Sequence, residues 1–191
     1  MKVYKIKGVE YSLRNKSKEV TLNEFAKISH ILSDDEKDVT DRWLEVLTIL
    51  SSKELVNQLT LPQFTSAIQS CNLMDVKGKV TKRIEVAGRS YECDVVKGQI
   101  QLNARDLSAI EKLAKAGESF GAKVFALVYK DTQLTNEEHF TDAHINHKAK
   151  LFGDAVMADV AAPAIIQVGT IIMEHFNKMV NASSPSVPSA E

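Results

Sequence analysis

Hydrophobic and polar side chains alternate at the start of the chain, over residues 3–7 and again over 11–14. A period of two is typical of short strands, and Gly8 between the two runs indicates the turn of a hairpin. Thr21 and Glu24 then form a capping-box pattern, which predicts that a helix begins there. That helix places four apolar side chains on one face, at Phe25, Ile28, Ile31 and Leu32.

The same pattern returns 80 residues later. The motif Gly-x-x-Tyr occurs at Gly8 and again at Gly88, and Leu-Asn occurs at 22–23 and again at 102–103. A second helix is expected over residues 103–117, with its apolar face displaced by two further positions. We expect a duplicated hairpin-plus-helix unit, and a chance likeness between two short hairpin patterns is the alternative.

Between the two units, apolar spacing predicts helices over residues 40–50, 52–59 and 61–71, the last with Pro62 in its first turn. After the second unit, residues 122–129 form an uninterrupted apolar run that we interpret as a buried strand. Residues 135–152 are helical in pattern, with a break expected at Gly153. The predicted fold class is α+β: two β-hairpin-plus-helix units, a helical insertion and a C-terminal helical region.

These elements suggest three parts of the chain. Residues 1–75 hold the first hairpin and a helical cluster, and residues 76–181 hold the second hairpin unit with the C-terminal helices. Residues 182–191 are small, polar and proline-rich, which is typical of a tail with nothing to bury.

The most apolar stretch lies near the C-terminus, at residues 155–180. Its uncharged part, Val160–Met173, is shorter than the roughly 20 residues that cross a bilayer, and Pro163, Gln167 and Gly169 interrupt it. We therefore expect an interface between chains and no membrane anchor. The residues predicted to form this interface are Ile165, Ile166, Val168, Ile171, Ile172 and Met173.

Composition narrows the class of partner. The 24 basic and 25 acidic side chains leave a net charge of −1, so no overall field attracts nucleic acid or an anionic membrane. A short basic run at residues 77–83 has no interleaved aromatics, so nucleic acid is not expected as a partner. The 8 glycines form no phosphate-binding loop, and Cys71 and Cys93 form no CxxC motif. No cofactor is therefore expected.

Three histidines gather in one segment, at His139, His144 and His147. The spacing of the last two places them on one helical face, as a metal site requires, with Glu138 or Asp142 as a possible carboxylate ligand. A solvated helix is the alternative, and it agrees better with the absence of an HExxH pattern. No GxSxG motif is present either, so a non-catalytic protein is expected, with a metal-dependent enzyme as the alternative.

Two segments of the sequence resemble a known group of proteins. The first is the Gly-x-x-Tyr hairpin followed by Thr-Leu-Asn-Glu-Phe at 21–25, and the second is the run from His144 to Phe152 with the small-residue segment 157–166. Together they resemble tail-assembly chaperones and baseplate-hub proteins of tailed bacteriophages. The resemblance implies a non-catalytic structural or assembly protein, in the virion or the host cytoplasm, with other virion proteins as partners and a homo-oligomer as a further possibility. A cytosolic protein-binding adaptor is the remaining alternative.

Overall fold

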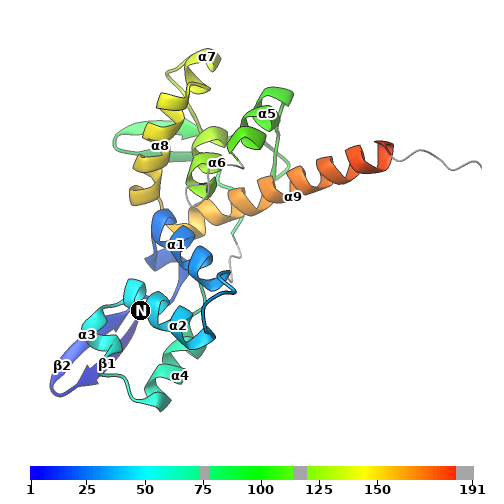
Figure 1. Ribbon diagram of the computed structural model, residues 1–191. Coiled ribbons are helices and arrows are strands. Elements are labelled where there is room, and N and C mark those ends of the chain that lie inside the picture. The colour runs from blue at the N-terminus through cyan, green and yellow to red at the C-terminus, as the bar shows by residue number, and fades with distance from the viewer. Residues whose placement is uncertain (74–77, 114–119, 184–191) are drawn as a thin grey trace, which may run out of the picture.

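The computed structural model describes residues 1–73, 78–113 and 120–183, and it confirms an α+β fold (Figure 1). Small antiparallel sheets and helices alternate along the chain. Strands β1 (Lys2–Ile6) and β2 (Val9–Leu13) form the first predicted hairpin. Strands β3 (Arg83–Val86) and β4 (Arg89–Glu92) form the second.

A third hairpin follows, made of β5 (Val95–Val96) and β6 (Gln99–Ile100), which the sequence pattern did not predict. All three hairpins close with the same two-residue turn. Its first residue, Lys7, Ala87 or Lys97, has φ of 51°, and the glycine that follows has φ between 74° and 83°. Two consecutive positive φ angles are typical of a type I′ turn, which matches the twist of paired strands and explains the glycines.

The two predicted units share local features, although the third hairpin separates the second predicted hairpin from its helix. Tyr4 pairs with Tyr11 in the first hairpin, and Ile84 pairs with Tyr91 at the equivalent place in the second. The capping box predicted at Thr21 is confirmed at the start of α1 (Leu22–Leu32). Asn103 forms a similar reciprocal cap at the start of α5 (Ala104–Leu113), 82 residues after Thr21. The Asn103 side chain accepts a hydrogen bond from the Asp106 amide, and the Asp106 side chain accepts one from the Asn103 amide.

Four helices and the first hairpin surround one hydrophobic cluster. They are α1, α2 (Val39–Leu50), α3 (Lys53–Val56) and α4 (Leu61–Ser70), and a 3-10 turn (Ser17–Glu19) leads from the hairpin into α1. The helices predicted between the two units are confirmed, although α3 spans only four residues. The buried members of this cluster are Tyr4, Leu13, Val20, Ile28, Val46, Leu47, Leu50, Leu55, Val56, Ala67 and Leu73.

The second cluster lies among α5, α6 (Phe120–Val128), α8 (Asp142–Ala155), α9 (Ala158–Ser183) and the second hairpin. Strand β7 (Lys130–Asp131) adds to the free edge of β4, and α7 (Asn136–His139) precedes α8. The aromatic rings of Tyr91, Phe125, Tyr129 and Phe152 pack against each other at its centre.

Two local predictions were wrong. Residues 122–129, expected as a strand, belong almost entirely to helix α6. Residues 124–129 are all buried, so the run has no polar face and its periodicity does not distinguish a helix from a strand. Helix α8 also continues through Gly153, where a break was expected. A Cβ at Gly153 would lie 2.2 Å from the Asn23 side chain, so this glycine permits α1 to approach α8 closely.

Helix α1 connects the two clusters. Ile28 belongs to the first cluster and Leu22 to the second. At its start, the Leu22 amide donates to the Val156 carbonyl at 2.8 Å, and the Ala158 amide donates to the Val20 carbonyl at 2.8 Å. The beginnings of α1 and α9 are therefore joined by backbone hydrogen bonds.

Two expected features lie partly outside the described residues. They are the tail predicted over residues 182–191, from residue 184 onward, and the helix predicted over residues 103–117, from residue 114 onward.

Candidate functional site

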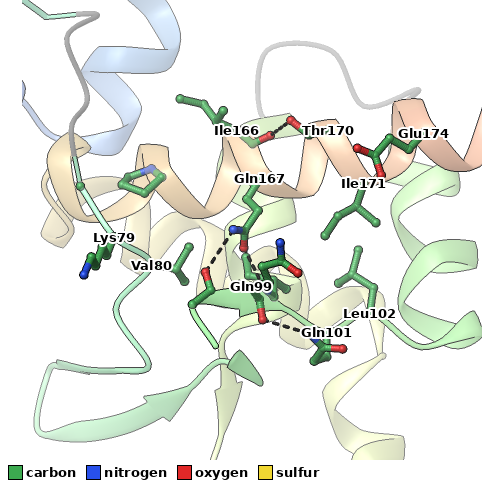
Figure 2. A pocket seen from close by; sticks show the side chains of 14 residues that line it. Lys79, Val80, Gln99, Gln101, Leu102, Ile166, Gln167, Thr170, Ile171 and Glu174 are labelled. Atoms are coloured by element: carbon green, nitrogen blue, oxygen red, sulfur yellow. Dashed lines mark hydrogen bonds between the residues drawn. The ribbon is translucent and has the colours of Figure 1, made fainter. Parts of the chain in front are cut away.

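Helix α9 carries the residues predicted to form an interface, and one side of it forms the floor of a groove. Its first half is anchored in the second cluster by Ala161, Ala164 and Val168. The groove has a volume of about 720 Å³, with walls formed by residues 78–80 and 98–102 (Figure 2). A Cβ at Gly78 would lie 2.8 Å from Cγ of Pro163, so only glycine lets the first wall pack this closely on the helix.

Gln167 fixes the position of the second wall. Its Oε1 accepts from the Ile100 amide at 2.7 Å, and its Nε2 donates to the Gly98 carbonyl at 3.2 Å (Figure 2). The side-chain amide thus makes the pair of bonds that a residue of a neighbouring strand would make with β6. Gln167 is a polar residue in an apolar part of α9, and its role here is to pair with backbone groups at the edge of β6.

The groove combines apolar walls with a polar rim. Val80, Leu102 and Ile171 line its interior, and Figure 2 shows Leu102 and Ile171 facing each other across it. Lys79 and Glu174 lie at opposite ends in the same view. Apolar contact area beside accessible backbone groups suits a polypeptide ligand better than a small charged metabolite.

The six predicted interface residues divide into three groups. Val168 is 1% exposed and belongs to the core, so it is not available to a partner. Ile165, Ile171 and Ile172 are half-buried and pack against the same cluster. Ile166 and Met173 are 57% and 65% exposed, as an interface requires. All six were expected to contact a partner, but the second cluster covers one side of the helix.

Sequence reasoning missed Phe176, which is 42% exposed on the last turns of α9. It lies three residues after Met173 and ten after Ile166, so the three side chains form a stripe on the outer side of the helix. The spacing was visible in the sequence, but the expected interface ended at Met173. Gly169 lies on the same stripe, and a Cβ there would meet no atom within 4 Å.

The three histidines do not come together. His147 is exposed, whereas His139 is 4% exposed and its ring centroid lies 5.7 Å from that of His144. The pairing expected between His144 and His147 is replaced by one between His139 and His144. Within residues 1–73, 78–113 and 120–183, no three His, Cys, Asp or Glu side chains are placed to hold a metal ion.

Charged side chains around these histidines belong to the core. Lys148 is 1% exposed and its Nζ donates to the Tyr129 carbonyl at 2.9 Å. Burial lowers the pKa of this amine to about 7, and it lowers the pKa of His139 to about 4 with a further contribution from Lys148. Asp131 is also buried, and it pairs with Arg89 at 3.3 Å.

Neither cysteine is an activated nucleophile. Both thiols are free, and burial raises the pKa of Cys71 to about 11 and that of Cys93 to about 12. A thiol with a raised pKa is protonated at neutral pH and reacts slowly. Both side chains pack as small hydrophobic groups.

Among the described residues, no helix combines the length and the apolar character needed to cross a membrane. Comparison of the chain with protein-family models, with curated proteins and with solved structures found no match.

Proposed function

We propose that this chain is a non-catalytic structural or assembly protein of a bacteriophage particle, in the tail or baseplate, and that it acts through contacts of α9. The observation that carries the proposal is the exposed stripe of Ile166, Met173 and Phe176 on this helix. The assignment to a phage particle comes from the resemblance of two sequence segments to tail-assembly and baseplate-hub proteins.

The physical argument concerns the end of α9. The C-terminal part of α9 extends away from the other elements (Figure 1), and Met173 and Phe176 are exposed on this helix. A few helical turns without tertiary contacts are marginally stable in water, so a helix of this kind gains stability from a partner. Burying each large apolar side chain contributes about 1.5–3 kcal/mol, which makes the stripe a suitable contact surface.

The two alternative functions would use different residues of the chain. A cytosolic protein-binding adaptor would use the same stripe, so only the identity of the partner separates it from a phage protein. A metal-dependent enzyme built on His139, His144 and His147 would need all three imidazoles at one ion, and His147 lies exposed while His139 is buried. The described residues give that alternative no specific support.

Mass spectrometry of purified particles tests the assignment to a phage. In the phage that encodes this chain, a structural component is expected in the mature particle, and an assembly factor is expected only with tail or baseplate intermediates. The chain's absence from both fractions, despite its expression in infected cells, would reject the proposal and favour the cytosolic adaptor.

A pair of charge substitutions tests the contact surface. Met173→Asp with Phe176→Asp is expected to abolish association with the partner, because two carboxylates would be buried in the contact without counter-charges. The measurement is co-sedimentation with particles or intermediates, together with the unfolding midpoint of the isolated chain. That midpoint should change little, because both side chains are exposed.

The matched control is Lys178→Glu, which makes the same change in net charge at an exposed position on the other side of the helix. It should associate normally. Equal loss of association in both variants would mean that overall charge, and not the apolar stripe, governs binding.

A further inference from the structure

One edge of β6 faces the groove beside α9, and part of it is not paired by any residue that the structure describes. In the hairpin of β5 and β6, Val96 pairs with Gln99 and the Gln101 amide donates to the Asp94 carbonyl at 2.9 Å. Backbone groups alternate between the two sides of a strand, so the groups of Ile100 and the amide of Leu102 face away from β5. The Ile100 amide is taken by Gln167. The Ile100 carbonyl and the Leu102 amide have no hydrogen-bond partner among the described residues.

The opposite wall shares this property. Gly78, Lys79 and Val80 make no backbone hydrogen bond to any other described residue, and they line the same groove. Unpaired backbone groups on an edge are a template for pairing with another chain. The Gln167 amide already pairs with this edge at Gly98 and Ile100, in the positions where a neighbouring strand would pair.

We propose that the groove binds an extended segment of a partner protein, which adds to β6 as a short strand. The segment's backbone accepts a hydrogen bond from the Leu102 amide and donates one to the Ile100 carbonyl. Its inward side chains are apolar and contact Leu102 and Ile171. Its ends carry an acidic residue opposite Lys79 and a basic residue opposite Glu174, because these charges lie at opposite ends of the groove (Figure 2).

This site adjoins the outer stripe of α9, because Ile166 belongs to the stripe and also lines the groove. Met173 and Phe176 do not line the groove, so substitutions at these two residues test the stripe, and Thr170→Arg tests the groove. The proposal therefore stands on the strand edge and goes beyond the function proposed above.

The test is a titration of the ¹⁵N-labelled full chain with a blocked peptide, acetyl-Glu-Val-Thr-Val-Thr-Lys-amide, followed by NMR. Shifts are expected at the amides of Leu102, Ile100 and Gly98. A peptide of the same sequence, N-methylated at the alternate residues whose amides face β6, cannot donate hydrogen bonds to that strand and is expected to bind at least about tenfold more weakly.

Two matched variants locate the site. Thr170→Arg introduces a long side chain into the groove and is expected to weaken binding by at least about tenfold, whereas Asn177→Arg, on the same helix outside the groove, should leave affinity within about twofold. Thr170 is exposed, and unfolding midpoints equal to that of the unchanged chain show that both variants fold.

Three results would overturn the proposal. They are an absence of shifts at Leu102 up to millimolar peptide, equal affinity for the N-methylated peptide, and unchanged affinity in Thr170→Arg. A shift of the Leu102 amide with protein concentration in the absence of peptide would also overturn it, because a second copy of this chain would then fill the groove.

Discussion

At the scale of single residues, Lys148 is the most unusual side chain. A fully buried amine whose hydrogen bond is to one carbonyl lowers the stability of a fold, because its charged form is desolvated. Its pKa is about 7 in the folded chain and near 10.5 in the unfolded chain. Between these two pKa values the unfolded chain binds more protons than the folded chain, so the free energy of unfolding rises with pH through this range. The destabilisation by the buried charge is fully present below pH 7.

Lys148→Met is expected to increase the free energy of unfolding at pH 7 by about 1–3 kcal/mol, since methionine fills a similar volume without a charge. It should also remove the rise in stability between pH 7 and about 7.5, a window that ends about one pH unit below the pKa of a thiol in an unfolded chain. Urea unfolding at the two pH values measures both effects. Lys150→Met, at an exposed position, should change neither, and an equal gain there would point to a general effect of charge.

At the scale of elements, the three type I′ turns are strained at their first residue. Lys7, Ala87 and Lys97 adopt the left-handed region that glycine and asparagine tolerate better. Ala87→Asn is expected to raise the free energy of unfolding by about 0.5–1 kcal/mol, because Asn is favoured at this turn position. Gly88→Ala, with φ of 74° at that position, should lower it by about 1 kcal/mol.

Chemical denaturation of the two variants checks the turn, since the substitutions are adjacent but their effects are opposite in sign. If both lowered stability equally, the turn would not hold the conformation described.

At the scale of the whole molecule, contact between the two halves depends on α1 lying close against α8. The Asn23 side chain lies over Gly153 and its Nδ2 donates to Asp154 Oδ1 at 2.8 Å. Gly153→Ala is expected to lower stability by about 1 kcal/mol, because Asn23 must rotate away and lose this bond. Replacing glycine by alanine inside a helix otherwise stabilises by about 0.5–1 kcal/mol.

Gly169→Ala is the control, because the added Cβ would meet no atom within 4 Å. It should raise the unfolding midpoint, whereas Gly153→Ala should lower it. A rise in both variants would show that α1 does not approach α8 closely in solution.

Local signals in the sequence determined much of this protein. Alternation with a central glycine predicted the first two hairpins, and the pair Thr21 and Glu24 predicted the start of α1. These features depend on bonds between residues close along the chain, so composition and spacing are sufficient. The α+β class follows from them.

Only the tertiary structure decided which apolar faces are buried and which polar groups meet. Six consecutive apolar residues, all of them buried, led to the prediction of a strand where α6 lies. Val168 and Met173 were both predicted to lie at an interface, but the second cluster buries Val168 and leaves Met173 exposed. His139 lies close to His144 although the two residues belong to different helices, α7 and α8, and spacing along the chain does not reveal this contact. The groove is also a tertiary feature, since Gln167 meets Gly98 and Ile100 across more than 60 residues of sequence. Burial and long-range pairing depend on distances in space, and a linear pattern of residue types carries little information about them.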